Sequence, residues 1–391
     1  MTSSLSDRSQ YPCLRDSVYL NQASLGLIGE PAVAAMHDFL ENVARHGNLF
    51  MSDDDEIKYG HALREVASRL FHDDPSRIAI LAGASELLGQ LPLLFRLKPN
   101  ATIVAIASDF PAITRPWVRQ SYVEKTRVRF VDDLPDRDLT DAIINAMDET
   151  TGVIAVSSVQ YATGTLVDVR RLASSAKKVG AFLIVDATQA AGAIQVDTSL
   201  LDADAVVVSG YKWLGGHGGV ALAAVSESLL KQLPILPGWM GAQDPFDFDA
   251  KSVSFASDAR RFTQSTMSYV SIAGLTVSIE QLLSLGENRI EEHAHQLAVM
   301  LVDGARDYGW QPFHDIHGVA ASPHIISLGH SRKYARETVE KLRDQRIICS
   351  VRGERIRVSL APYNNSSDVM NFLHALAGLK LGARFAVGDK S

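Results

Sequence analysis

Two residues capable of chemistry, an aspartate and a lysine, each follow an apolar run of the kind that forms a buried strand. In the segment FLIVDATQAAG the run ends on Asp186, and Gln189 comes shortly after it. In AVVVSGYKWLGGHGG, Lys212 comes soon after the next run. The carboxyl ends of neighbouring parallel strands meet at one edge of a sheet, where open α/β folds bind their ligands. We therefore expect Asp186 and Lys212 to lie on the same edge of a sheet.

Each of the two residues also has a simpler interpretation. Asp186 could cap a following helix, because aspartate is among the best N-cap residues. Lys212 could be a solvated residue at the end of a strand, because lysine is rarely buried without a partner. An apolar setting would instead lower the pKa of the lysine and make its amine a nucleophile toward carbonyls. The two residues together favour a chemical role.

A third segment, ILAGASELLGQL, supplies a candidate anion site. It predicts a strand that ends at Gly83 and a helix that begins near Ala84 and Ser85, with free backbone amides and a hydroxyl at its positive end. A capping signal is the alternative. Ser209, close before Lys212, offers a second hydroxyl.

These three features match the needs of pyridoxal 5'-phosphate. The cofactor requires a lysine for its aldehyde, an acid that keeps its pyridine nitrogen protonated, and donors for its phosphate. We expect Lys212 to hold the cofactor as a Schiff base and Asp186 to charge its ring nitrogen.

The elements that would position these residues form a regular alternation from about Ile78 to Val225. Between apolar runs, stretches such as Leu139 to Met147 and Asp168 to Val179 have apolar residues at helical spacing. This rhythm predicts an α/β fold with a doubly wound, mainly parallel sheet. The runs are IAIL, TIVAIA, VRFV, GVIAVSS, FLIVDA, AVVVSG and VALAAV.

A chain of 391 residues is too long for one ordinary core. We predict an N-terminal arm over 1–20, a large cofactor-binding domain over 21–265 with an ordered loop at 237–265, and an interface segment with a small α+β domain over 266–391. In the last part we expect helices over Ile272 to Leu285, Arg289 to Tyr308 and Asp368 to Leu379, and strands at HIISLG, IICSVR and IRVSLA.

Composition argues against several classes of protein. The net charge is -7 and the basic residues are scattered among acids, so we expect no nucleic-acid partner. The first residues are polar and no apolar run is long enough to span a bilayer, which predicts a cytoplasmic protein without a membrane partner. The cysteines Cys13 and Cys349 have no metal-ligand spacing and are too few for a disulfide framework.

Taken together, these segments resemble the class V aminotransferase family of fold-type I pyridoxal phosphate enzymes, which includes cysteine desulfurases, isopenicillin N epimerase and kynureninase. The resemblance runs from about Tyr19 to Leu379. It implies a seven-stranded large domain, a small C-terminal domain, an amino-acid substrate and a homodimer with the active site at its interface.

Several residues around the cofactor follow from this resemblance. GASE is similar to the phosphate-binding turn and assigns that role to Ala84 and Ser85. SDFPAITRPW places Phe110 over the pyridine ring, a contact worth about 1 kcal/mol, although Phe110 could also be a core residue. VQYATG places Tyr161 near the phenolic oxygen of the cofactor, where Gln189 is the other ligand.

The resemblance also assigns residues near the lysine and on the substrate side. SGYKW has Tyr211 where many members have histidine, and the nearby His217 could partly replace it. The segment RRFTQSTMSYV implies that Thr266 reaches the phosphate of a partner chain. In IRVSLAPYNN, Arg357 is implied to bind the substrate carboxylate, whereas without the resemblance it would be a surface residue. VYLNQASLG adds Asn21 on the substrate side.

Lys212, once released by the substrate amine, would remove or return the Cα proton. Elimination, epimerisation and transamination all remain open at that point. Cysteine desulfurases carry a mobile-loop cysteine, whereas Cys349 lies in the predicted strand IICSVR and is expected to be a buried apolar residue. We therefore favour a lyase that cleaves a C–S or other Cβ bond of a cysteine-derived or modified amino acid. The alternatives are an aminotransferase or epimerase of a specialised amino acid, and a non-catalytic binding protein.

Overall fold

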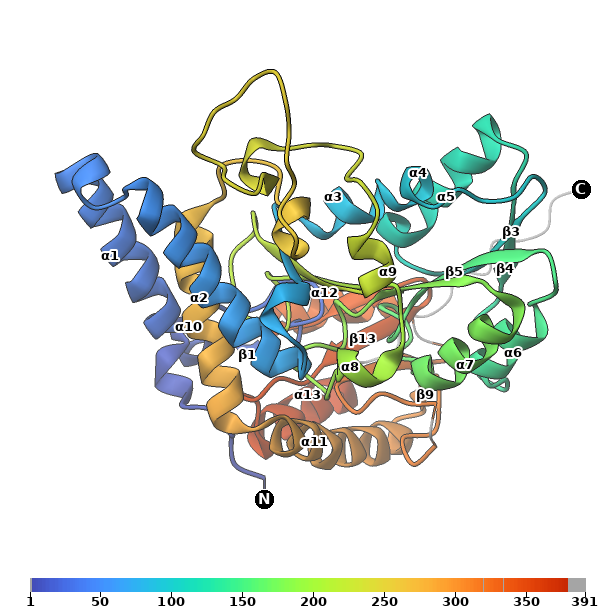
Figure 1. The fold of residues 1–391 in the computed structure, drawn as a ribbon. Coiled ribbons are helices and arrows are strands. Elements are labelled where there is room, and N and C mark those ends of the chain that lie inside the picture. Colours follow the sequence, from blue (N-terminus) through green and yellow to red (C-terminus); the bar gives the residue numbers. More distant parts are fainter. Residues whose placement is uncertain (1, 319, 333, 379–391) are drawn as a thin grey trace, which may run out of the picture.

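A seven-stranded sheet forms the centre of the larger part of the molecule (Figure 1). The structure, a computed structural model, describes residues 2–318, 320–332 and 334–378. The strands follow the order β2, β8, β7, β6, β5, β3, β4. They are β2 (Ile78–Leu81), β3 (Thr102–Ile106), β4 (Arg127–Val131), β5 (Thr151–Ser157), β6 (Phe182–Asp186), β7 (Ala205–Ser209) and β8 (Ala221–Val225).

The pairing confirms the predicted mainly parallel α/β sheet. β4, β3, β5, β6 and β7 pair in parallel, whereas β8 runs antiparallel to both β7 and β2. Every residue of β2, β3 and β8 is buried, which explains why these strands are continuous apolar runs without polar alternation.

Helices cover both faces of this sheet, and each face has its own apolar cluster. The cluster on one face includes residues of α2 (Asp53–Phe71), α6 (Leu139–Asn145), α7 (Val169–Val179) and α10 (Tyr269–Leu285). The cluster on the other includes residues of α3 (Ala84–Leu88), α4 (Leu91–Leu94), α5 (Pro111–Val123) and α9 (Glu227–Leu230). α1 (Glu30–His46) packs on α10, and α8 (Thr198–Leu201) connects β6 to β7.

The smaller part consists of a four-stranded antiparallel sheet covered by helices. Along its strand β13 the residues alternate, so that Ile356 and Val358 enter the apolar cluster while Arg355, Arg357 and Ser359 lie on the opposite face. The elements are α11 (Glu287–Asp307), β9 (Gln311–Pro312), β10 (Ile325–Gly329), α12 (Ala335–Asp344), β12 (Ser350–Arg352), β13 (Arg355–Ser359) and α13 (Ser366–Gly378).

One predicted strand of the smaller part is wrong. The run Ile347–Arg352 forms two short strands in different sheets, β11 (Ile347–Ile348) and β12, which are separated at Cys349. β11 pairs in parallel with β1 (Val18–Tyr19), close to the N-terminus. The run divides because the first half binds the N-terminal segment while the second half forms a hairpin with β13.

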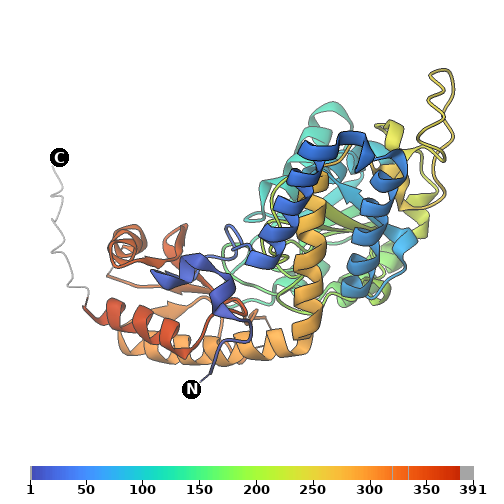
Figure 2. The same cartoon turned by 90° about the vertical axis from the view of Figure 1, so that its left-hand side faces the viewer.

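α10 connects the two parts of the molecule. It lies beside α1 and α2, and a bend of 75° separates it from α11 in the smaller part (Figures 1 and 2). Within the described ranges no single helix is long and apolar enough to cross a membrane, although α10 and α11 meet that length and composition together as a bent pair. The loop from Pro237 contains short 3-10 turns, at Trp239–Gly241 and Ala259–Phe262, and an isolated antiparallel bridge between Ala242 and Phe255, and it projects away from the sheet (Figure 2).

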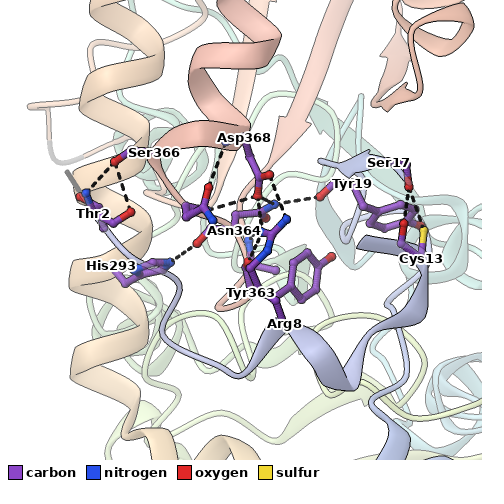
Figure 3. Close-up of polar contacts among 12 residues, drawn as sticks. Thr2, Arg8, Cys13, Ser17, Tyr19, His293, Tyr363, Asn364, Ser366 and Asp368 are labelled. Atoms are coloured by element: carbon purple, nitrogen blue, oxygen red, sulfur yellow. Dashed lines mark hydrogen bonds and ion pairs between the residues drawn. The ribbon is translucent and has the colours of Figure 1, made fainter. Parts of the chain in front are cut away.

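The N-terminal arm is fastened to the smaller part by polar contacts (Figure 3). Arg8 donates to both carboxylate oxygens of Asp368, at 2.7 and 3.2 Å, and to the carbonyl oxygen of Tyr363 at 2.6 Å. Thr2 and Ser366 exchange backbone and side-chain hydrogen bonds. The Asp368 carboxylate also accepts from Asn364, so it is both buried and saturated with donors.

We predict that Arg8→Ala will lower the free energy of unfolding by about 1–3 kcal/mol, because it removes charge-assisted bonds from a buried carboxylate. Denaturant unfolding measured by tryptophan fluorescence would test this. Arg45→Ala is the matched control, since it removes an exposed ion pair with Glu41 and should cause no measurable change. Equal effects of the two substitutions would contradict the structural role of Arg8.

Candidate active site

A cavity of about 220 Å³ opens at the carboxyl edge of the seven-stranded sheet, where the sequence predicts the ligand site. Nine of the predicted residues line it, and three others, Asn21, Thr266 and Arg357, are not part of its wall. The nine are Ala84, Ser85, Phe110, Tyr161, Asp186, Gln189, Ser209, Tyr211 and Lys212.

Lys212, the residue predicted to hold the cofactor, lines this cavity. Its side chain is buried although lysine normally stays in water. Burial lowers the pKa of Lys212 to about 8, and repulsion from Arg357 and Arg352 adds to this while Asp186 opposes it. About a tenth of the amine is therefore neutral at pH 7 and able to attack a carbonyl, far more than for an ordinary lysine.

Two buried carboxylates, Asp186 and Asp109, lie at this edge of the sheet. Asp186 ends β6, accepts from the backbone N–H of Thr188 at 2.9 Å, and has a pKa raised by burial. Asp109 follows β3 and accepts from the backbone N–H groups of Ser157 and Phe110, both at 2.7 Å. Burial raises the pKa of Asp109 to about 6. Asp109 thereby fixes two residues of the cavity wall, Ser157 and Phe110.

Aromatic rings form the wall next to the amine. Nζ of Lys212 lies 5.1 Å from the ring centroid of Phe110 and 5.6 Å from that of Tyr211. The ring of Tyr161 meets Phe110 edge to face, with centroids 5.5 Å apart. Phe110 is 40% exposed, so it is not the core residue that one reading of the sequence allows. An open aromatic face beside the amine suits a flat heteroaromatic ring.

The residues present fit pyridoxal 5'-phosphate. The buried carboxylate of Asp186 suits a protonated pyridine nitrogen, and the amine of Lys212 suits an aldehyde. The hydroxyls of Ser85 and Ser209 line the cavity as candidate phosphate donors. Gly83, Gly218 and Gly219 also line the cavity, and because they carry no side chain they leave room for a ligand.

Residues near the N-terminus bind the backbone that carries the lysine. Nε2 of Gln22 donates to the carbonyl oxygen of Lys212 at 2.9 Å, and the backbone N–H of Gly26 donates to that of Tyr211 at 3.0 Å. A Cβ atom at Gly26 would lie 2.1 Å from the Lys212 carbonyl oxygen, so only glycine permits this approach. The segment NQASLG therefore fixes the backbone that carries the lysine.

Gln189 has protein partners for both ends of its amide. Nε2 donates to the carbonyl oxygen of Ala23 at 3.0 Å, and Oε1 accepts from the indole N–H of Trp213 at 2.7 Å. Its backbone carbonyl accepts from Nε2 of the fully buried His324 at 2.6 Å. The contact of Gln189 with the cofactor stays a prediction, and it would have to form alongside these hydrogen bonds to the protein.

Arg357 is 1% exposed, so it is not a surface residue. It donates to the carbonyl oxygen of Tyr161 at 2.7 Å and to the hydroxyl oxygen of Ser24. The same hydroxyl accepts from Arg352 at 3.0 Å. Nε of Arg357 and Oδ1 of Asn21 are buried without a hydrogen-bond partner among the described residues. Both predicted substrate-side residues thus keep unused polar atoms.

Thr266, His217 and Cys349 also lie outside the cavity. Thr266 is exposed just before α10, where a single chain does not test its predicted contact with a partner. His217 is exposed and bonds to the adjacent Gly218 carbonyl at 3.0 Å. Cys349 is 4% exposed within the apolar cluster of the smaller part, as expected.

Sequence reasoning missed Asp109, Ser24, Arg352 and His324. For Asp109 a signal existed, because it follows an apolar run just as Asp186 does. Ser24 and Arg352 become meaningful only through their contact, which joins segments more than three hundred residues apart. No local pattern in the sequence reveals such a contact.

The sequence model of the family described as Aminotransferase class-V matches residues 18–372. Over 95% of its length the chain is 24% identical to an uncharacterized aminotransferase, YcbU, of Bacillus subtilis (strain 168), covering 96% of that protein. It is 27% identical to the cysteine desulfurase CsdA of Escherichia coli (strain K12), over 94% of this chain and 96% of the relative. These matches confirm the resemblance inferred from the motifs.

Solved structures share the fold. The complex of the cystine C-S lyase C-DES with its product cysteine persulfide superimposes with a TM-score of 0.86 at 19% identity, covering 94% of this chain and 99% of that one. The match extends over both the seven-stranded sheet and the smaller part.

The buried His324 generates a prediction about pH. Burial lowers its pKa to about 4, because protonation would place a second N–H on Nδ1, which has no partner in the described structure. Between about pH 6.5 and 4 the unfolded chain takes up a proton that the folded chain does not, so the free energy of unfolding falls as pH falls.

The variant His324→Gln keeps a donor for the Gln189 carbonyl and removes this titration. Between pH 7 and pH 5 the parent protein should lose about 2 kcal/mol more unfolding free energy than the variant. Urea unfolding at the two pH values would measure the difference. The pKa values of His293 and His314 are also lowered by burial, but they contribute equally to both proteins. Equal pH dependence of the two proteins would show that His324 is not buried and neutral.

Proposed function

We propose a specific reaction for this chain, which belongs to the aminotransferase class-V family. The proposal is that it is a lyase that cleaves a C–S or other Cβ bond of a cysteine-derived or modified amino acid. Family membership makes it a pyridoxal-phosphate-dependent enzyme that acts on amino acids. The finer reaction rests on one observation, which is that neither cysteine of the chain lies in the cavity.

The cavity residues would divide the work as follows. When bound, pyridoxal 5'-phosphate supplies an electron sink for negative charge that develops at the substrate Cα. Asp186 would hold a positive charge on the pyridine nitrogen. Ser85 and Ser209 would bind the phosphate, with Thr266 of a second copy as a further donor in a proposed homodimer. Phe110 would lie against one face of the ring.

Lys212 would act on the substrate once its amine is free. With a pKa near 8, the amine can accept the Cα proton near neutral pH and later return it. Arg357 would bind the α-carboxylate through its unused N–H groups, including Nε, and so orient the Cα–H bond toward Lys212. Asn21 would lie on the same side of the substrate.

The cysteines favour elimination over sulfur transfer to a protein thiol. Burial raises the pKa of Cys349 to about 12, so its thiolate is scarce and enclosed in an apolar cluster. Cys13 lies on the N-terminal arm, where its sulfur contacts Ser17 at 3.2 Å. A β-elimination needs no protein thiol: Lys212 removes the Cα proton, the C–S bond breaks, the thiolate leaves with a proton, and hydrolysis of the remainder gives pyruvate and ammonia.

The comparisons are consistent with either of two reactions. The likeness to the cystine C-S lyase structure suits elimination, whereas the relative named as an aminotransferase suits transfer of the amine to a 2-oxo acid. An aminotransferase is therefore the second candidate. The two reactions can be distinguished by experiment, because only transamination requires a 2-oxo acid, which accepts the amine.

Substitution of the lysine tests the cofactor assignment. Lys212→Ala should no longer form a borohydride-reducible bond between the chain and the cofactor, because no other amine lines the cavity within the described chain. Borohydride reduction of the parent protein followed by peptide mass analysis should find the pyridoxyl group on Lys212. Lys231→Ala, which changes an exposed lysine, is the control and should stay coloured. A Lys212→Ala protein in which borohydride still fixes a pyridoxyl group to the chain would refute the assignment.

The reaction type is tested with L-cystine and S-substituted cysteines in the absence of any 2-oxo acid. We expect release of pyruvate and ammonia in equal amounts. Cys349→Ala and Cys13→Ala should retain this activity, since elimination uses no protein thiol. If product forms only when a 2-oxo acid is added, the enzyme is an aminotransferase. If either cysteine substitution abolishes turnover in a folded, coloured protein, a thiol relay replaces the proposed elimination.

A further inference from the structure

Two arginines lie next to the cavity wall, where both contact Ser24 and Arg357 also contacts the backbone of Tyr161, although one would suffice for an α-carboxylate. Arg352 on β12 and Arg357 on β13 both donate to Oγ of Ser24. In the hairpin Ser350 is the cross-strand partner of Arg357, so Arg352, two residues further on, lies on the same face as Arg357. Both guanidiniums also repel the Lys212 ammonium, which places them within its electrostatic range.

No acidic residue of the described chain pairs with either guanidinium. Apart from Ser24, their recorded bonds go to the backbone carbonyl oxygens of Tyr161 and Val351. Burial and mutual repulsion lower the pKa of Arg357 to about 9, and burial lowers that of Arg352. A guanidinium has five N–H donors, so each keeps several for a ligand. One carboxylate would neutralise only one of the two charges.

We propose that the substrate is an amino acid with a second acidic group on its side chain, and that Arg357 binds the α-carboxylate while Arg352 binds the second group. This inference rests on the proposed function, because it assumes that an amino acid reacts at Lys212.

The geometry supports one anion for each arginine. Both guanidiniums donate to Oγ of Ser24, which therefore takes the position that an oxygen of a shared carboxylate would need. Each arginine is left to bind an anion of its own. Arg357 is the more buried and repels the Lys212 ammonium more strongly, which suits the group attached to Cα. Arg352 is only half-buried and therefore suits a group further along the side chain.

Arg355 provides a matched control within the same hairpin. It lies on the same face of the sheet, but its guanidinium bonds to the carbonyl oxygens of Gln311 and Ser327, at 2.7 and 2.9 Å. It also lies 5.3 Å from the ring centroid of Phe313. Arg355 thus carries the same charge without facing Ser24.

The test uses the cofactor-loaded protein and pairs of amino acids that differ only in one charge. The pairs are aspartate with asparagine, glutamate with glutamine, and S-carboxymethylcysteine with its carbamoylmethyl analogue. Dissociation constants are measured from the change in cofactor absorbance. At least one acid should bind about tenfold tighter than its amide partner or better, as expected for charge-assisted hydrogen bonds.

Arg352→Gln should abolish this preference and leave the affinity for the amide partner nearly unchanged. Arg352→Met repeats the measurement if the glutamine variant fails to fold, and Arg355→Gln should keep the preference. Arg357→Gln should weaken both members of each pair. An absent preference in the parent protein, or an Arg352 variant that weakens both members equally, would overturn the proposal. If borohydride finds no pyridoxyl group on Lys212, the proposed function fails as well.

Discussion

The burial of the Lys212 amine is the constraint on which the rest of the site depends. A lysine is rarely taken out of water without compensation, and here the compensation is divided. Burial and the two arginines, Arg357 and Arg352, favour the neutral amine, whereas Asp186 favours the charged one. Together these effects lower the pKa of Lys212 to about 8. The backbone of Lys212 is fixed by Gln22 and Gly26, so the amine cannot retreat toward solvent by shifting its loop.

This arrangement divides the site between the two parts of the molecule. The sheet edge supplies groups suited to a flat ring that carries a phosphate, since Asp186 and Ser209 lie on adjacent strands β6 and β7. The hairpin of the smaller part supplies the positive charges. Ser24 joins the two, because it precedes the close approach at Gly26 and accepts from both Arg352 and Arg357. A change in the position of the smaller part would therefore move the arginines relative to the amine.

The sequence predicts the parts of this site that follow strands and leaves out those built by distant contacts. Asp186 and Lys212 could be found because a buried strand is a continuous apolar run and its carboxyl end has a known place in α/β sheets. The division of Ile347–Arg352 into two strands could not be found, since it depends on pairing with Val18 and Tyr19 at the other end of the chain. The partners of Gln189 likewise come from three distant segments.

In the proposed reaction, these charges would couple substrate binding to proton transfer at Lys212. Arg352 and Arg357 lower the pKa of Lys212 while no anion neutralises them. A carboxylate bound to Arg357 would cancel much of that repulsion, and the pKa of a freed Lys212 amine would rise. The amine would then be a stronger base at the moment when a Cα proton lies beside it. The same arginines that favour the neutral amine before the cofactor is bound would thus, once the substrate carboxylate neutralises them, leave the freed Lys212 a better proton acceptor.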